Sequence, residues 1–217
     1  MTYEIISTGS QGNAVLIEDR ILIDCGVPFK ALKPSVKQLR LVLLTHIHSD
    51  HFKPRTVAAL CNERPALRWG CCEWMVQPLV DAGADRRRID VLLPGHTYHY
   101  EGLGDITPEA VPHNVPNCGY RIQSGGERLF YATDAATLDG VCAKDYDLYL
   151  IEANHTEAEI QARMEEKLSS GEFAYEFAAA QNHLSREQAE AWLMENAGEN
   201  SRYQFLHQHK KKAGDDR

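Results

Sequence analysis

The chain has 217 residues, of which 43% are hydrophobic and 25% are charged, and its formal net charge is −8. This balance is typical of a globular protein and excludes one that coats DNA through clustered Lys and Arg, although not a nuclease, whose metal ions supply local positive charge. No apolar run approaches the ~18 residues of a membrane span and the N-terminus lacks the layout of a signal peptide, so we expect a cytoplasmic protein with no membrane partner.

The first strands are expected between Tyr3 and Asp24, where short β-type runs alternate with turn residues in the pattern of a meander. The apolar run "RLVLLT" at 40–45 then has the length of a strand and stops at His46. Such a run favours a strand that is buried on both faces, with polar residues at its carboxyl end. Because proline suits the first turn of a helix, Pro54 predicts a helix through "RTVAALCNE".

The middle of the chain predicts a strand and a helix over 67–83, then another strand over 88–95. The segment 119–134 indicates a hairpin, because two β-type runs flank the tight turn "SGGE". A further buried strand, "DLYLIE", is expected at 147–152.

Two capped helices and a last strand are expected in the rest of the chain. Thr156 and Glu159 have the spacing of a capping box, and Ser185 begins a second capped helix, which is followed by the strand "YQFLH". We therefore expect one domain over 1–209, an α+β fold with two sheets and helices packed outside them. A charged tail over 210–217 follows it.

The segment "LVLLTHIHSDHF" crowds His46, His48, Asp50 and His51 directly after a predicted strand. In an extended chain, residues i and i+2 point the same way, so His46 and His48 can hold one metal ion. If the loop then turns, Asp50 and His51 can bind a second ion. Two metal ions ~3.5–4 Å apart activate a water molecule and neutralise negative charge when that water displaces a leaving group at phosphorus. Asp134, at the end of "RLFYATD", suits a carboxylate that contacts both ions. Without a metal, these charges would repel one another or lose hydration on burial.

The motifs resemble those of the metallo-β-lactamase-fold hydrolases, in the same order along nearly the whole chain. They are "LIDCG" with Asp24, "THIHSDH", "VPHNV" with His113, "YATDA" with Asp134 and "FLHQH" with His207. The resemblance implies a four-layer αββα sandwich with two divalent metal ions, Zn or Mn, at one edge of the sheets. It assigns His46, His48 and His113 to one ion, Asp50, His51 and His207 to the other, and Asp134 to both, while Asp24 would orient a ligand.

The segments "STGSQGNAVLI", "LIEANH" and "NHLSREQAEAWL" resemble the YycJ/WalJ branch of this family, thought of as DNA exonucleases, and more distantly tRNase Z. In tRNase Z a glutamate and a histidine together protonate the leaving oxygen, and Glu152 and His183 fall in the corresponding places. A carboxylate raises the basicity of its histidine partner and fixes its tautomer, so the pair can act as an acid near neutral pH. The candidate catalytic residues are therefore Asp50, Glu152 and His183.

Several features leave alternatives open. "FLHQH" offers His209 as well as His207 for the last ligand, no role is assigned to His155, and no long substrate-clamping arm is visible. The runs "RRR" at 86–88 and "KKK" at 210–212 could contact a phosphate backbone, although short charge runs are more often solvated.

The leading function is a phosphodiesterase acting on nucleic acid, a DNA exonuclease first. The alternative is a cyclic-nucleotide phosphodiesterase or another hydrolase of a small substrate, because the same two-metal chemistry serves either. A binding module with a dead site is the third possibility, and the complete ligand set argues against it. The sequence leaves the oligomeric state open.

Overall fold

The structure, a computed structural model, describes residues 1–170 and 181–207 of the chain. The first half of the chain forms a six-stranded sheet whose strands follow one another in spatial order. They are β1 (Tyr3–Ser7), β2 (Ala14–Ile17), β3 (Ile21–Ile23), β4 (Leu41–Leu44), β5 (Arg68–Cys71) and β6 (Ile89–Val91). The first three pair antiparallel, which confirms the predicted meander, and β3 to β6 pair parallel.

Short helices connect the parallel strands of this sheet. They are α1 (Phe29–Leu32), α2 (Pro54–Glu63), α3 (Val76–Asp81) and the 3-10 helices η1 (Glu73–Met75) and η2 (Arg86–Arg88). Pro54 is the first residue of α2, as predicted, because a proline there removes no hydrogen bond that the helix would form. Val57, Leu60 and Leu79 of α2 and α3 pack in one buried cluster with Val42 of the sheet. These helices therefore cover the outer face of the first sheet.

The second half of the chain forms the other six-stranded sheet, in the order β12-β11-β10-β9-β8-β7. Its strands are β7 (Tyr98–Tyr100), β8 (Gly104–Ala110), β9 (Cys118–Ser124), β10 (Glu127–Ala132), β11 (Leu148–Glu152) and β12 (Arg202–Leu206), and its helices include α4 (Glu157–Ser170) and α6 (Arg186–Asn196). The predicted hairpin is β9–β10, and Gly125 and Gly126 form its turn with φ of 60° and 85°, a region that favours glycine. The short edge strand β7 is absent from the predicted elements.

Both helix starts predicted in this half are capped. The Ser185 hydroxyl accepts a hydrogen bond from the backbone N–H of Gln188, whose side chain accepts one from the backbone N–H of Ser185, a complete capping box. At the start of α4, the backbone N–H of Glu159 donates to the Thr156 hydroxyl at 3.2 Å. The caps satisfy N–H groups that have no partner inside the helix, which is why the sequence located both starts.

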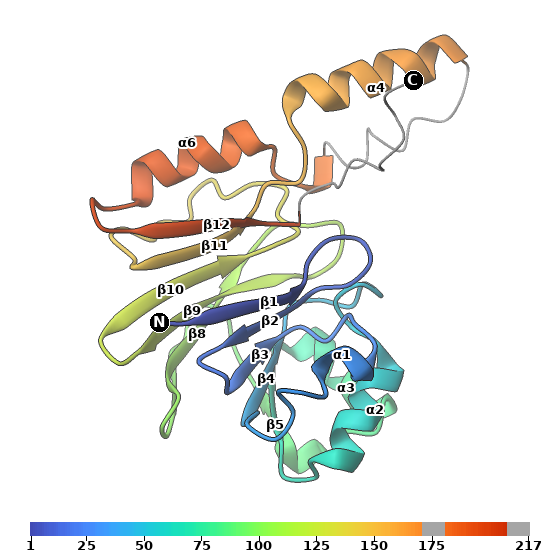
Figure 1. Cartoon of the computed structure of the whole chain (residues 1–217), viewed down its shortest axis with the longest axis vertical. Helices are drawn as coiled ribbons and strands as arrows, with labels where there is room; N and C mark the ends of the chain where they lie inside the picture. Colours follow the sequence, from blue (N-terminus) through green and yellow to red (C-terminus); the bar gives the residue numbers. More distant parts are fainter. Residues whose placement is uncertain (171–180, 208–217) are drawn as a thin grey trace.

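The two sheets lie face to face, with α1, α2 and α3 outside the first and α6 outside the second (Figure 1). Ile23 and Leu43 of the first sheet share one buried cluster with Tyr120 and Leu150 of the second. This arrangement confirms the predicted α+β fold and the four layers of an αββα sandwich. Among the described residues, no helix combines the length and the apolar character needed to cross a membrane.

Five strand ends place polar side chains at one edge of the sandwich. Because β3 and β4 run parallel, as do β10, β11 and β12, their carboxyl ends lie side by side. Asp24, His46, Asp134, Glu152 and His207 stand at these ends. Asp24, Asp134 and His207 have φ of 61°, 54° and 51°, in the left-handed region that residues other than glycine rarely adopt. Such strain persists where the surroundings fix it, and it is often found at functional sites.

The two basic runs of the sequence lie away from this edge or outside the described residues. Arg86–Arg88 form η2, which directly precedes β6, so they lie at the amino end of the parallel strands, opposite the edge with the polar side chains. The predicted tail over 210–217 and the alternative ligand His209 lie outside the described residues. The domain boundaries stay a prediction.

Candidate metal centre

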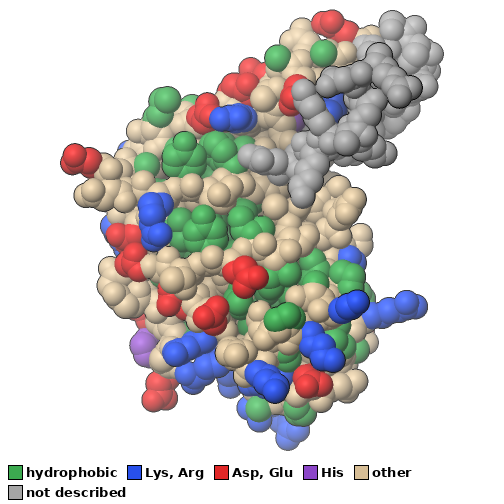
Figure 2. Space-filling model, viewed as in Figure 1, with side chains coloured by type: hydrophobic (Ala, Val, Ile, Leu, Met, Phe, Trp, Pro, Cys, Tyr) green, Lys and Arg blue, Asp and Glu red, His purple; other side chains and the backbone are tan. Residues whose placement is uncertain are grey.

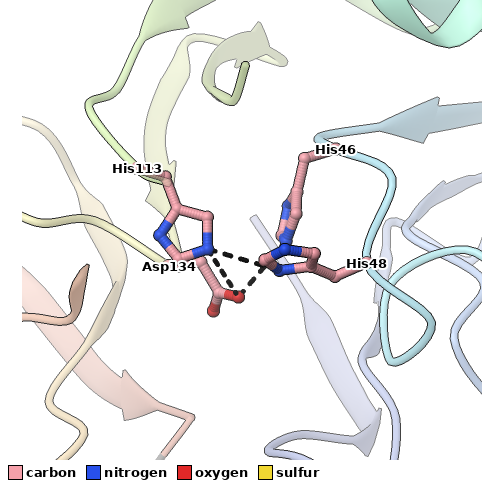
Figure 3. A group of neighbouring side chains, drawn as sticks. All are labelled: His46, His48, His113 and Asp134. Carbon is pink, nitrogen blue, oxygen red and sulfur yellow. Dashed lines mark hydrogen bonds and ion pairs between the residues drawn. The ribbon is translucent and has the colours of Figure 1, made fainter. Parts of the chain in front are cut away.

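Two groups of side chains at this edge have the composition of metal sites, and they share Asp134. In each group, one ligand atom per residue lies within 4.8 Å of those of the other members. The first group is His46, His48, His113 and Asp134 (Figure 3). The second group is Asp50, His51, Asp134 and His207. The structure thus brings together all of the side chains that were predicted as metal ligands.

His46 is oriented by its neighbour in the chain. The Thr45 hydroxyl donates to the Asp24 carboxylate, at 3.0 and 2.9 Å from its two oxygens, and can therefore accept from Nδ1–H of His46 at 3.0 Å. With the proton on Nδ1, the lone pair of Nε2 points into the cluster, 3.3 Å from Oδ2 of Asp134. The buried Asp24 thus fixes His46 through Thr45.

His113 and His48 face each other across the first group. Nδ1–H of His113 donates to the backbone carbonyl of Asn182 at 3.0 Å, which leaves its Nε2 3.3 Å from Nδ1 of His48 and 3.8 Å from Oδ2 of Asp134. Burial lowers the pKa of His113 to about 4 and also lowers the pKa of His48. Both rings therefore stay neutral near pH 7, and the neutral ring is the form that binds a metal ion.

The second group is held by Asp24 as well. Nδ1–H of His51 donates to Oδ2 of Asp24 at 2.7 Å, so the opposite nitrogen, Nε2, faces Oδ2 of Asp134 at 3.2 Å and Oδ2 of Asp50 at 3.7 Å. On the other side, Nε2 of His207 lies 3.7 Å from Oδ2 of Asp50. Asp24 touches His51 and Thr45 but belongs to neither ligand group, which fits the orienting role expected of it.

Asn13 is a site residue that the sequence reasoning missed. It lies in the turn "GSQGN", is 1% exposed, and its Nδ2 lies 2.8 Å from Nε2 of His51 and 3.4 Å from Oδ2 of Asp50. Its backbone N–H also donates to the Asp50 carbonyl at 2.6 Å. At Gly26, an added Cβ would come within 1.7 Å of that same carbonyl oxygen, so only glycine fits beside this loop. A buried amide needs polar partners, and an Asn at the start of a buried strand was the available signal.

Opposite charges balance at the centre of the cluster. Burial raises the pKa of Asp134, but the charges of His51 and His207 outweigh this and leave it well below its ordinary value. Burial lowers the pKa of His51 and of His207, and the Asp134 carboxylate reverses the effect, so both pKa values are raised. The buried carboxylate thus depends on nearby positive charge, which protons or divalent ions can provide.

Glu152 and His183 form a close pair beside the shared aspartate. Nδ1–H of His183 donates to Oε1 of Glu152 at 2.6 Å, and Oε2 of Glu152 accepts from the backbone N–H of Ala135 at 2.8 Å. Glu152 is fully buried, whereas the His183 side chain is 19% exposed. Burial lowers the pKa of His183, but the hydrogen bond and charge of Glu152 outweigh this and raise it. The same two residues also form a third possible ligand group with Asp134 and His207.

The other histidines in the described part of the chain do not join these groups. His155 is half-buried, and its Nδ1 has no hydrogen-bond partner among the described residues. His96 and His99 are exposed, and His99 pairs with Asp105 at 2.7 Å, as expected for ordinary surface residues.

The donor set of the cluster fits divalent transition-metal ions. Nε2 of His46 is buried and makes no hydrogen bond within the described part of the chain, although Oδ2 of Asp134 lies 3.3 Å away. A buried polar atom of this kind costs free energy unless a ligand satisfies it. Imidazole nitrogens together with carboxylate oxygens suit Zn, Mn or Fe, whereas calcium takes oxygen ligands.

We expect the purified protein to carry, or to take up, close to two transition-metal ions per chain, one for each group built on Asp134. Elemental analysis before and after dialysis against a chelator, and after addition of Zn or Mn, measures this number. The midpoint of thermal unfolding should rise on reconstitution, because an ion that binds only the folded chain stabilises it. A protein that neither retains nor acquires metal would contradict the expectation.

A family model described as "Beta-lactamase superfamily domain" matches residues 19–207 of the chain. "Exodeoxyribonuclease YycJ" of Bacillus anthracis is 26% identical over 174 residues, which cover 70% of this chain and 62% of that protein. The matched region thus spans less than two thirds of this relative's length.

Two solved structures have the same fold. The metallo-beta-lactamase fold protein YhfI of Bacillus subtilis superposes with a TM-score of 0.72 at 18% identity, covering 97% of this chain and 87% of that one. The short form of human tRNase Z superposes with a TM-score of 0.69 at 14% identity, covering 97% of this chain and 93% of that one. At these identities the likeness concerns the fold.

Proposed function

The chain belongs to the beta-lactamase superfamily, and from this premise we propose that it is a metal-dependent phosphodiesterase that trims the ends of nucleic acid, with DNA as its first candidate substrate. The observation that carries the proposal is the Glu152–His183 pair, hydrogen-bonded at 2.6 Å beside the aspartate that both ligand groups share. Cleavage of a phosphodiester bond expels a poor leaving group, an alkoxide, which needs a proton as the bond breaks. A histidine held by a buried carboxylate can supply that proton.

His183 is arranged for this proton transfer. Glu152 accepts from Nδ1 and so fixes the ring, which leaves Nε2 to hold a proton and pass it to the leaving oxygen. Because the Glu152 charge raises the pKa of His183, the ring can be protonated near neutral pH. The buried position of Glu152, with the Ala135 N–H on its other oxygen, keeps the carboxylate from rotating away.

The metal ligands proposed are those of the two groups: His46, His48 and His113 for one ion, Asp50, His51 and His207 for the other, and Asp134 for both. When bound, the ions would supply positive charge for the phosphate group and lower the pKa of the attacking water. The side chain of Asp50 is 20% exposed, and its carboxylate would accept a hydrogen bond from that water.

The charge distribution favours an end-acting enzyme over one that binds a long stretch of polymer. The net charge is −8, and the run Arg86–Arg88 lies at the edge opposite the ligand groups. An enzyme that binds a chain end can obtain most of its phosphate recognition from two metal ions and needs few further cations. The similarity to an exodeoxyribonuclease supports DNA as the polymer.

A cyclic-nucleotide phosphodiesterase, or a hydrolase of another small substrate, is the second candidate. The observation in its favour is that the run Arg86–Arg88 lies at the edge opposite the ligand groups, because a small substrate needs no polymer track. The chemistry of the metal centre would be unchanged.

We expect metal-dependent shortening of nucleic acid from its ends, strongest on DNA. The experiment compares labelled single- and double-stranded DNA and RNA with cyclic mononucleotides and dinucleotides, with Zn or Mn supplied. The Asp50→Ala/His51→Ala variant is the control, since it removes two ligands of one group. Hydrolysis of a cyclic nucleotide without cleavage of any polynucleotide would overturn the nuclease proposal and favour the second candidate.

A further inference from the structure

A hollow of about 520 Å³ opens directly beside the first ligand group. It is lined by Trp74, Pro94 and residues 110–117, so His113 belongs both to the hollow and to the metal centre. Its volume falls within the ~300–1,000 Å³ that is usual for small-molecule sites. A group bound here would therefore adjoin anything held at the ligand groups.

The walls of the hollow are tied to the metal centre on two further sides. The indole N–H of Trp74 donates to the backbone carbonyl of Thr45 at 3.1 Å, one residue before His46. The side-chain amide of Asn117 donates to the backbone carbonyl of Asp134 at 2.9 Å. These two hydrogen bonds fix the half-buried indole ring and the Asn117 wall of the hollow relative to the metal-ligand side chains. Such a fixed arrangement suits a site in which one molecule occupies both the hollow and the metal centre.

The lining selects an uncharged ring over a charged group. None of its side chains is Lys, Arg, Asp or Glu; indole, proline rings and valine dominate, with His113, Asn114 and Asn117 as the polar members. Two other hollows, both away from the ligand groups, contain charged side chains such as Arg121 and Arg20. A phosphate would need positive charge, whereas the flat face of an aromatic heterocycle stacks well on indole.

We propose that this hollow receives the nucleobase of the nucleotide whose phosphodiester lies at the metal centre, with the base stacked on Trp74. The inference rests on the proposed function, because a base reaches the hollow only when its own phosphate is at the adjoining ligand groups. Every base has a π face, so all four bases can stack on the indole ring. The hollow would therefore favour a nucleotide that carries a base over one that lacks it, but would not distinguish one base from another. Trp74 is thereby assigned a binding role.

The test compares DNA ends that carry a normal base with the same ends carrying an abasic residue. We expect kcat/KM of the wild-type protein to be higher for the normal end by roughly 5- to 100-fold, the range that stacking of one base provides. In Trp74→Ala this ratio should fall towards one, and Trp74→Phe should retain part of it. Tyr203→Ala, which removes an aromatic side chain that is 57% exposed on β12, should keep the wild-type ratio.

A binding measurement separates failure of this inference from failure of the proposed function. Titration with deoxyadenosine monophosphate should quench tryptophan fluorescence in the wild type and much less in Trp74→Phe, while deoxyribose 5-phosphate should quench neither. If this pattern of quenching is found but the protein cleaves no polynucleotide, the proposed base site is supported and the nuclease proposal is overturned. Two outcomes would overturn the base site alone. One is equal cleavage of normal and abasic ends by the wild type. The other is an equal decrease in kcat/KM on both kinds of end in Trp74→Ala and Trp74→Phe.

Discussion

Replacing Asp134 by Ala should remove metal from both ligand groups and lower turnover by more than about 100-fold, since even residues that only support a metal ligand typically cost 10–100-fold. Asp134 belongs to both groups, and its Oδ2 lies 3.3 Å from Nε2 of His46 and 3.2 Å from Nε2 of His51. Its carboxylate also balances the positive charge that gathers on His51 and His207. No other aspartate or glutamate among the described residues contacts both groups in this way.

Asp50→Ala is the matched control for this prediction. Asp50 belongs to the second group alone, so its loss should release one ion and leave the first group, with His46, His48 and His113, still able to bind. Elemental analysis and calorimetric titration with Mn measure both occupancies, and Asp134→Asn tests whether charge or size matters. Loss of a single ion in Asp134→Ala would count against the bridging role.

The sequence predicted those parts of the centre whose ligands follow a strand. His46 and His48 lie at i and i+2 after the apolar strand β4, and Asp134 follows β10, so pattern and strand direction suffice to bring them together. The capped helices were predicted for the same reason, because a cap and its partner lie within one turn.

Contacts between turns that are distant in the sequence could not be predicted from strand direction or residue spacing. Asn13 and Asp50 lie 37 positions apart, and their contact depends on how closely the glycine-rich turn and the ligand loop approach each other. The pairing of Glu152 with His183 was expected only through the family resemblance, since they are 31 positions apart and neither follows from periodicity. The hollow beside His113 was not predicted, because Trp74 lies in η1, after β5 of the first sheet, whereas the 110–117 segment connects β8 and β9 of the second.

The pairing of Glu152 with His183 gives the second large effect. We expect His183→Ala and Glu152→Ala each to lower turnover on DNA ends by about two to four orders of magnitude, the usual range for loss of a general acid. The double variant should be little worse than either single one, because the two side chains act as a unit. Glu152→Gln removes the negative charge but keeps an oxygen that can accept from the Ala135 N–H. This variant therefore tests the effect of the charge without displacing the loop that carries Asp134.

The pH dependence of turnover has a definite sign. A general acid must be protonated, so activity falls as the pH rises through its pKa. Burial lowers the pKa of His183, but the hydrogen bond and the negative charge of Glu152 outweigh this and raise it. Because Glu152→Gln removes that negative charge, the pKa of His183 should fall in this variant. The high-pH limb of kcat should therefore move to lower pH in Glu152→Gln than in the wild type.

A second substrate distinguishes proton transfer from metal binding. An aryl diester such as bis(p-nitrophenyl) phosphate expels a stable phenolate that needs no proton, so His183→Ala should affect it far less than it affects a DNA end. If His183 instead served as a metal ligand in the third group, with Asp134, Glu152 and His207, its loss would lower metal content and slow both substrates alike. Metal content near wild type together with a leaving-group-dependent loss supports the acid role. Near-wild-type activity of His183→Ala on DNA ends would exclude it.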